Sequence, residues 1–262
     1  MTGLPTMDKE QHAEFAEKGY VRLGKALNAE ELEALRGRID AIMLGQIPYA
    51  NMSFQLDGKT GAYRDVPPES AGHKGATLQY RKIMGLEQDP LFLAYMQKPL
   101  FRQLTQRYIG PEVSIFRAMF MNKPAHQGSE LPWHQDVGEG WGLDANPTIT
   151  VWTALDAATR EKGCMQLVPG SHQLGVVNPQ HFLSAEDQAR CAPPERVVYL
   201  EAEAGEAVLL HNLLLHRSGT NTTDQPRRAF SAAYMDAATR AVATGRAFPV
   251  IFGQGALRPA SP

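Results

Sequence analysis

The segment VSIFRAMFMNKP (113–124) is the first of several short β-like runs that follow one another through the second half of the chain. The others are TITVWTALDAA (148–158), CMQLVPGSH (164–172), ERVVYLEAEAGEAVLLHN (195–212) and RAFSAAYMDA (228–237), with glycine, proline and asparagine between them. Several strands in succession without intervening helices predict a barrel or a sandwich.

The segments before these runs have a helical pattern. MDKEQHAEFAEKGYVRL (7–23) begins with acidic residues and meets a stop signal at Gly19. LNAEELEALRGRIDAIM (27–43) can be capped by Asn28, with Glu31 three residues on, and residues 89–110 are helical again. Residues 46–78 are rich in Gly, Pro, Asp and Ser, which predicts a long loop region.

We therefore expect a mostly β protein with flanking helices. The predicted organisation is a single domain over 1–262, with a helical N-terminal part at 8–110 and a β core at about 111–240.

The composition argues against several classes of partner. A net charge of −2 over 262 residues gives no overall attraction to nucleic acid or to an anionic membrane. No stretch approaches the roughly 20 apolar residues of a membrane span, and the first residues lack the apolar core of a signal peptide. Two cysteines make no disulfide framework, so we expect a reduced, cytoplasmic protein.

Histidines near the predicted strand ends indicate a metal site. In LPWHQDVGEG (131–140), His134 and Asp136 are two residues apart and would share one face of a strand. In AGEAVLLHNLLLHRSGTN (204–221), an apolar strand leads to His216, which we expect to arrive from the opposite side of a barrel. Two imidazoles and one carboxylate on one face of a metal leave its other face open, which suits non-haem Fe(II) oxygen chemistry.

Arg227 follows His216 at a spacing that suits the next strand. Arg227, in QPRRAF (225–230), comes 11 residues after His216, enough for a turn and a return along the next strand, where it could grip a carboxylate. Arg228 alternates with it, so only one of the two should face inward. The spacing favours Arg227, whereas a bulge would exchange them. His211, five residues before His216, cannot share its face and is not expected to be a ligand, and His172 is expected to be structural.

With these motifs the sequence resembles the phytanoyl-CoA dioxygenase-like Fe(II)/2-oxoglutarate oxygenases from about residue 10 to residue 236. The resemblance is carried by GYVRL, MNKPAHQGSELPWHQD, VWTALDAATREKGCMQLVPGSH and HRSGTNTTDQPRRAFSAAY. It implies a double-stranded β-helix, a cupin-like jelly-roll barrel backed by helices.

The resemblance also implies roles for individual residues. His134, Asp136 and His216 resemble the iron ligands. Arg227 is similar to the partner of the distal carboxylate of 2-oxoglutarate, and Ser218 to the hydroxyl that supports it. Two further residues are similar to family positions in the barrel: Asn122 to a polar group near the chelating end of the co-substrate, and Trp152 to a lining residue. His126, Cys164 and Met165 are not expected to be catalytic.

The implied cofactors are Fe(II), 2-oxoglutarate as co-substrate, and O₂. The implied reaction is hydroxylation of an unactivated C–H bond in a small-molecule substrate, coupled to decarboxylation of 2-oxoglutarate to succinate and CO₂. Because Asp136 keeps the carboxylate that related halogenases lack, hydroxylation, desaturation or epoxidation is favoured over halogenation. The alternatives are a metal-dependent cupin-like isomerase or hydrolase, and a binding module without metal; Arg227 and Ser218 argue for the oxygenase.

Two segments, 46–82 and 137–146, are expected to select the substrate. Their candidate residues are Tyr49, Phe54, Gln55, Tyr63, Arg64, Gln79, Tyr80, Arg81, Lys82 and Trp141. This mixture of aromatic and basic side chains suits a small polar or anionic molecule with an apolar part. The sequence shows no extended basic patch for a coenzyme A phosphate, so a small metabolite is favoured over a CoA ester.

Overall fold

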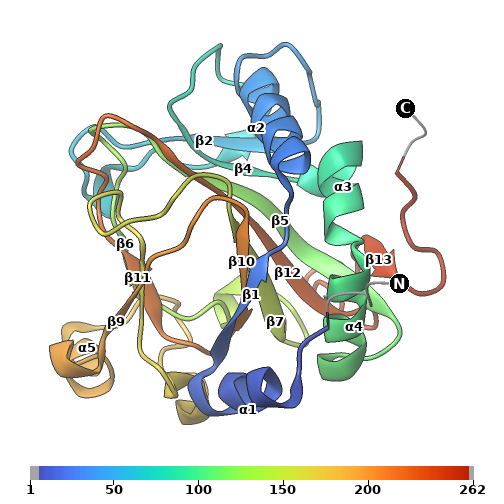
Figure 1. The fold of residues 1–262 in the computed structure, drawn as a ribbon, viewed down its shortest axis with the longest axis vertical. Helices are drawn as coiled ribbons and strands as arrows, with labels where there is room; N and C mark the ends of the chain where they lie inside the picture. The colour runs from blue at the N-terminus through green and yellow to red at the C-terminus, as the bar shows by residue number, and fades with distance from the viewer. Residues whose placement is uncertain (1–5, 260–262) are drawn as a thin grey trace.

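Two antiparallel sheets and the helices around them make up the computed structural model, which describes residues 6–259 (Figure 1). The first residues of the chain, on which the expectation about a signal peptide partly rests, lie outside the described residues. Within residues 6–259, no helix is long and apolar enough to cross a membrane.

The larger sheet has nine strands among the described residues. In spatial order they are β1 (Tyr20–Lys25), β10 (Glu206–His211), β7 (Ile149–Ala154), β12 (Arg227–Asp236), β5 (Val113–Lys123), β4 (Tyr80–Met84), β2 (Ser53–Leu56) and β3 (Ser70–Ala71), with β13 (Val250–Phe252) also paired to β5. The pairing of β5 with β12 runs almost the full length of both strands and forms the centre of the sheet.

The smaller sheet has four short strands. Their order is β6 (Leu131–His134), β11 (His216–Ser218), β8 (Met165–Leu167) and β9 (Val198–Leu200). Strand neighbours in both sheets are separated by long stretches of sequence, so the chain crosses repeatedly between the two sheets. The expectation of a mostly β protein with flanking helices is confirmed.

Alternation along the central strands divides the interior into two layers. Phe120, Phe230 and Tyr234 point from the large sheet into a hydrophobic core shared with the helices. Trp152, Val208 and Leu210 point the other way, into a second cluster with Met165 and other residues of the small sheet. The space between the two sheets is therefore lined by the opposite face of the same strands.

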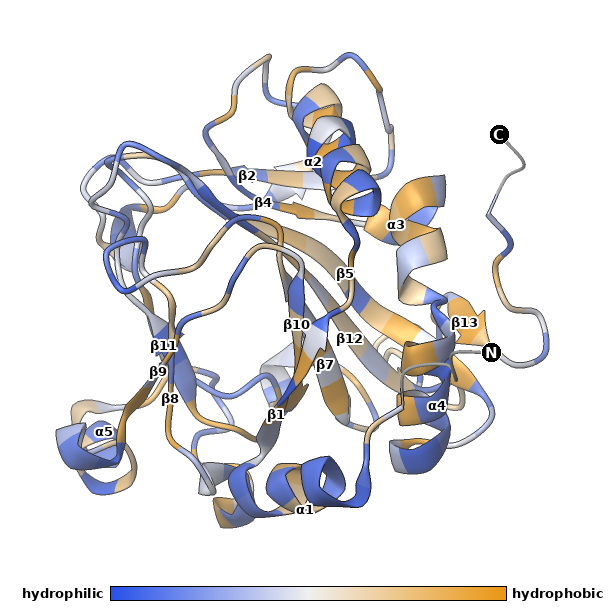
Figure 2. Ribbon diagram, in the orientation of Figure 1, coloured by the Kyte–Doolittle hydropathy of each residue, from blue (hydrophilic) through white to orange (hydrophobic). Residues whose placement is uncertain are grey.

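Five α-helices are present in residues 6–259. They are α1 (Lys9–Lys18), α2 (Ala29–Met43), α3 (Pro90–Met96), α4 (Pro99–Tyr108) and α5 (Ala185–Cys191). The expected caps are confirmed: Asn28 and Glu31 form a capping box on α2, and α1 ends at Gly19 with φ +77°, a conformation that favours glycine. Figure 2 shows hydrophilic and hydrophobic residues alternating along α1, as expected for a helix that covers a core.

The N-terminal part differs from the expectation in two ways. Strands β1 to β4 lie within 8–110, and β2 and β3 lie inside the segment expected to be a loop. These strands are short and at the sheet's edges, where the polar, Gly-rich sequence gives little alternation to read. The helical stretch 89–110 is two helices, because Pro99 opens a new helix and cannot extend the previous one.

Candidate metal centre

A cavity of about 900 Å³, counted with its open mouth, lies between the two sheets. The large sheet contributes side chains from β4, β5, β7, β10 and β12, and the small sheet contributes β6, β8 and β11. Every residue expected to bind metal or co-substrate lines this cavity, namely His134, Asp136, His216, Arg227, Ser218 and Asn122.

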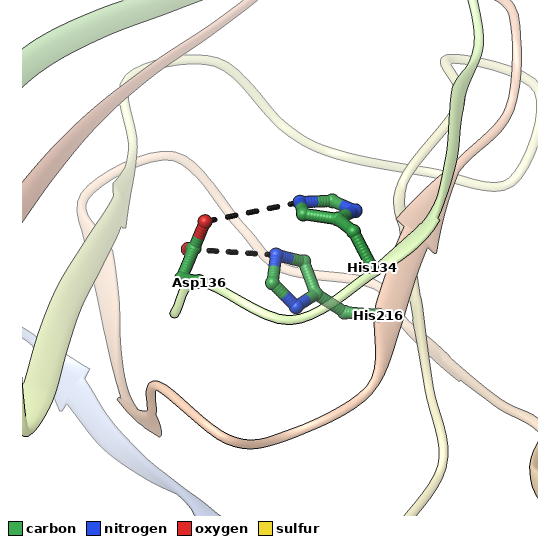
Figure 3. Close-up of side chains that lie close together, drawn as sticks. All are labelled: His134, Asp136 and His216. Atoms are coloured by element: carbon green, nitrogen blue, oxygen red, sulfur yellow. Dashed lines mark ion pairs between the residues drawn. The ribbon is translucent and has the colours of Figure 1, made fainter. Parts of the chain in front are cut away.

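His134, Asp136 and His216 converge at one side of the cavity (Figure 3). The Nε2 atom of His134 lies 3.9 Å from Oδ1 of Asp136, and Nε2 of His216 lies 3.6 Å from Oδ2 of the same carboxylate. The three potential ligand atoms all lie within 4.8 Å of one another. Two atoms bound to one ion at about 2.1 Å can be no more than about 4.2 Å apart, so both nitrogen–oxygen separations fit a shared metal.

The other nitrogen of each imidazole is fixed by the backbone. Nδ1 of His134 is 2.8 Å from the Pro132 carbonyl oxygen, and Nδ1 of His216 is 2.9 Å from that of Leu214. A carbonyl oxygen only accepts, so each Nδ1 carries a proton, and in the neutral ring Nε2 is the nitrogen that presents a lone pair. Both lone pairs therefore face a carboxylate, an arrangement that a cation between them stabilises.

Burial strengthens this arrangement at His134. The ring is almost fully buried, and desolvation, with His216 and His181 nearby, lowers the pKa of His134 well below its usual range. Two nitrogen donors and one carboxylate, grouped on one side of a cavity, make a donor set suited to a divalent transition metal such as Fe(II).

Asp136 lies just beyond the strand instead of on it. Strand β6 ends at His134, so the expectation of a regular strand through both ligands is wrong. Asn212 holds the chain there: its carbonyl accepts from the Asp136 N–H at 2.9 Å, and its amide donates to the Asp136 carbonyl at 3.1 Å. Gln135 points away between the ligands and donates to the carbonyls of Gly175 and Leu213.

His216 also arrives differently from the expectation. The apolar strand β10 ends at His211, and a turn carries the chain into the small sheet, where His216 begins β11. There it is paired directly with His134 on β6, instead of facing it from the opposite side. The two imidazoles are therefore neighbours in one sheet, with ring centroids 4.1 Å apart.

The far end of the cavity holds two buried cations. Arg227 and Lys123 are directly opposite each other on β12 and β5, and each is 5% exposed or less. Arg227 donates to the Gly163 carbonyl at 2.7 Å, but its Nε has no partner, and neither side chain forms an ion pair within residues 6–259. Burial lowers the pKa of Arg227 to about 10 and that of Lys123 well below its usual range. Such a pair lacks an anion.

Ser218, Trp152 and Asn122 also line the cavity. Ser218 lines the cavity together with His216, as their two-residue spacing predicts, and Trp152 lines it from β7. The amide nitrogen of Asn122 donates to the carbonyls of Leu78 and Tyr80, so this side chain fastens β4, while its Oδ1 is buried without a partner. The co-substrate roles of Ser218 and Asn122 remain predictions.

Arg228 faces away from the cavity. Its guanidinium binds Asp156 at 2.8 Å and Asp40 of α2 at 2.7 Å, and these contacts raise its pKa above the usual value despite its burial. No bulge exchanges the two arginines at this end of β12. Arg227 is therefore the one that lines the cavity.

The other histidines that the sequence singled out lie elsewhere. His211 and His172 pack together near α1, with ring centroids 5.1 Å apart, and neither lines the cavity. His126 lies in a turn with a positive φ. Cys164 is buried and free, and burial raises the pKa of its thiol to about 11, which disfavours a reactive thiolate.

Several lining residues were not expected from the sequence. His181 lies against His134 with ring centroids 4.9 Å apart, and its Nδ1 is buried without a partner. Lys123 and Arg117 also line the cavity. The strand 113–123 offered a signal for the last two, since Arg117, Met119, Met121 and Lys123 alternate along it. His181 follows an Asn-Pro turn and has no such pattern.

The two substrate segments reach the cavity at a few positions only. Tyr63, Arg81 and Lys82 line it, and the Trp141 ring lies over the guanidinium of Arg117 at 4.2 Å. Others have structural contacts, such as the Tyr49 hydroxyl, which donates to Asp89. Arg81 comes from a bulge in the β2–β4 pairing, which explains why it and Lys82 both reach the same cavity.

Known proteins share this sequence pattern and this fold. The chain is 25% identical over 236 residues to peroxisomal phytanoyl-CoA dioxygenase from Rattus norvegicus, covering 86% of this chain and 67% of that protein. It is 25% identical to L-proline trans-4-hydroxylase from Streptomyces griseoviridis, covering 81% of each chain. The crystal structure of the epimerase SnoN in complex with Fe³⁺, alpha ketoglutarate and nogalamycin RO has a TM-score of 0.66 at 20% identity, over 89% of this chain and 85% of that one.

The chain has the cupin-like fold of these oxygenase structures, as expected. Residues 15–229 match the sequence profile of the family described as "Phytanoyl-CoA dioxygenase (PhyH)". The chain is therefore a member of the phytanoyl-CoA dioxygenase family, which confirms the predicted family and places the protein among the oxygenase enzymes. It spans about two thirds of the length of the mammalian relatives.

Proposed function

We propose that this protein is an Fe(II)- and 2-oxoglutarate-dependent dioxygenase that hydroxylates an unactivated C–H bond of a small molecule. The observation that carries the proposal is the pairing of two incomplete sites in one cavity. At one, two imidazole lone pairs face a carboxylate and need a cation. At the other, Arg227 and Lys123 are buried opposite each other and need an anion.

The residues present fit both groups. His134, Asp136 and His216 would hold the metal, and Arg227 and Lys123 would bind the distal carboxylate of 2-oxoglutarate. When bound, Fe(II) with O₂ and 2-oxoglutarate supplies the oxidising power, as 2-oxoglutarate is converted to succinate and CO₂. Support comes from the relatives: SnoN was crystallised with both Fe³⁺ and alpha ketoglutarate, and another relative is named a proline hydroxylase.

The chain's own residues orient the reactants and exclude water. The Arg227 guanidinium would fix one end of the co-substrate, and we expect the Ser218 hydroxyl, which lines the same cavity, to donate to the same carboxylate. Met119, Met121 and Trp152 add apolar side chains to the wall of the same cavity. A dry wall keeps a reactive centre from oxidising water or the protein itself.

Asp136 favours hydroxylation over halogenation, because its carboxylate occupies the ligand position that a halide would need. The cupin-like isomerase or hydrolase reading would leave two buried cations without a use. The isomerase or hydrolase is therefore the alternative that a titration with Fe(II) and 2-oxoglutarate has to exclude.

Two further expectations are proposals at this point. We propose that residues 1–262 act as one domain, because strands β1 to β4 from the N-terminal part belong to the same sheet as β5 to β12. We also propose a reducing, cytoplasmic setting, since both cysteines are free and buried.

The test is an anaerobic titration of the metal-free protein with Fe(II) and then with 2-oxoglutarate. The expected result is a weak visible metal-to-ligand charge-transfer band in the wild type that needs a much higher 2-oxoglutarate concentration in Arg227→Gln. Arg64→Gln is the control, because the Arg64 side chain is 88% exposed. Iron binding without any such band would favour the isomerase or hydrolase, and an unchanged Arg227→Gln titration would remove Arg227 from the co-substrate site.

A further inference from the structure

The cavity contains more positive charge than the proposed cofactors can neutralise. Among the described residues that line it, six are basic, namely Arg81, Lys82, Arg117, Lys123, Arg217 and Arg227, and Asp136 is the one acid. Fe(II) and 2-oxoglutarate carry opposite double charges, so loading both leaves this excess unchanged. Two of these six are already engaged: Lys82 binds Glu69 at 2.5 Å, and Arg217 donates to Gln166 and lies over the Trp133 ring. A further anion is therefore expected in the loaded site.

Two of the basic residues lie at opposite ends of the part of β5 that lines the cavity. Arg117, Met119, Met121 and Lys123 present alternate side chains of β5 to the cavity. Six residues separate Arg117 from Lys123, which is about 20 Å at the usual rise of a strand. Lys123 is paired with Arg227, whereas Arg117 is paired with Ala233 at the other end of β12. A co-substrate held at Arg227 therefore leaves Arg117 free.

The Arg117 guanidinium lies beside two aromatic rings and keeps its donors available. It lies 4.2 Å from the Trp141 ring centroid and 4.7 Å from that of Phe116, and these two rings stack on each other. Within residues 6–259, Arg117 makes no hydrogen bond or ion pair with a side chain. Stacking uses the face of a guanidinium and leaves its in-plane N–H groups free to bind an anion in fork geometry.

The nearby acids do not satisfy Arg117. Glu69 and Asp136 are the carboxylates whose charges act on it. Glu69 is already bound to Lys82 and to the Ser53 hydroxyl, and Asp136 faces the two imidazoles. Arg117 is only partly exposed, and the Arg227 end is fully buried. The Arg117 end is therefore the one nearer the mouth, where a substrate would enter after the co-substrate.

We propose that the primary substrate carries an acidic group, a carboxylate or a phosphoryl group, that binds Arg117 beneath Trp141. This inference rests on the proposed function, since it assigns the substrate class of the same site. Arg81, whose guanidinium lies over the Tyr63 ring at 5.1 Å, adds positive charge beside the bound substrate. The Tyr63 ring, which lines the cavity, suits an apolar or planar body attached to the acid.

Isothermal titration of the anaerobic protein, loaded with Fe(II) and saturating 2-oxoglutarate, tests the proposal. The probes are benzoate, phenylphosphonate and benzamide, which share a ring and differ in charge. At least one anion should bind about tenfold or more tightly than benzamide, the difference expected for one charge-assisted pair. The tighter of the two anions identifies the acidic group.

Arg117→Met, which keeps the apolar stem over Trp141, is expected to abolish the preference for the anion. Arg117→Gln is a second variant, to be used if Arg117→Met does not fold. Arg64→Gln should retain it, since Arg64 lies outside the cavity. Equal binding of benzamide, no binding of either anion, or wild-type binding by both Arg117 variants would overturn the proposal. The 2-oxoglutarate titration on the same sample reports separately on the proposed function, because it depends on the Arg227 end.

Discussion

Arg227 and Arg228 are adjacent residues with opposite surroundings. Arg228 is bound to Asp40 and Asp156, so its charge is compensated within the protein. Arg227 is buried at 2% exposure beside Lys123 with no acid bound to it among the described residues. A buried cation of this kind destabilises the ligand-free fold and is retained for what it binds.

The paired substitutions Arg227→Met and Arg228→Met should therefore diverge. Arg227→Met should keep or raise the melting temperature of the ligand-free protein and weaken 2-oxoglutarate binding by about 1.5–3 kcal/mol. Arg228→Met leaves Asp40 without its cation and Asp156 with Arg36 alone, and should lower the free energy of unfolding by about 1.5–3 kcal/mol, with 2-oxoglutarate affinity retained. Thermal denaturation and calorimetry measure both; the reverse pattern would contradict the assignment.

Asp136→Ala should remove the metal while preserving the fold. Asp136 lies beyond the end of β6 and its side chain is 26% exposed, so it contributes little packing. The expected result is loss of stoichiometric Fe(II) by elemental analysis, with a melting temperature of the metal-free protein close to that of the wild type. Asp187→Ala, on α5 and outside the cavity, is the matched control, because its side chain is 24% exposed and it should bind iron normally. Full iron content in Asp136→Ala would exclude it as a ligand.

At the scale of elements, the C-terminal end of α1 is held by two histidines, His211 at the end of β10 and His172 in the turn 171–174. The His211 N–H donates to the Gly19 carbonyl at 2.8 Å, and a ring nitrogen of His172 binds the Ala16 carbonyl at 3.1 Å. Burial, with His172 close by, lowers the pKa of His211 from 6.5 to about 4. In the unfolded chain His211 therefore binds a proton at about pH 6.5, whereas in the folded chain it binds that proton only at about pH 4.

Stability should thus fall as the pH is lowered from about 6.5 to about 4. A shift of this size corresponds to on the order of 2–3 kcal/mol. His211→Asn keeps an acceptor for the Leu213 N–H, which His211 Nδ1 binds at 3.1 Å, and should flatten the pH dependence by up to one proton. Urea denaturation across this range measures the slope, and identical slopes for both proteins would contradict the pKa assignment.

The elements also show what the sequence could predict. Some features depend only on neighbours in the chain and were predictable. They are the helix caps at Asn28 and Gly19, and the alternation that turns Arg227 inward and Arg228 outward. The position of His216 beside His134 depends on a turn that moves the chain from one sheet to the other, and Asp136 is held by Asn212, which is remote in sequence. The edge strands β2 and β3 have little alternation of their own, because their stability comes from pairing with β4 and with each other.

For the whole molecule, ligand binding and folding stability should be linked. A ligand that binds only the folded state at 100 times its dissociation constant adds about 2.7 kcal/mol. Fe(II) with 2-oxoglutarate, added anaerobically, should therefore raise the melting temperature of the wild type, and 2-oxoglutarate should add less in Arg227→Met. Differential scanning calorimetry measures the shift. An equal increase in both proteins would show that 2-oxoglutarate acts elsewhere.

The pairing of His134 with His216 across β6 and β11 has a topological consequence. The two ligands close a loop of about 80 residues, which contains β7 and β10 of the large sheet together with α5, β8 and β9. An ion held by both histidines would act as a reversible cross-link, and a covalent link closing a loop of that length restricts the unfolded chain by on the order of 4–5 kcal/mol. The metal would then hold together the part of the chain that joins the two sheets, so that iron limitation would weaken the protein's resistance to proteolysis as well as its chemistry.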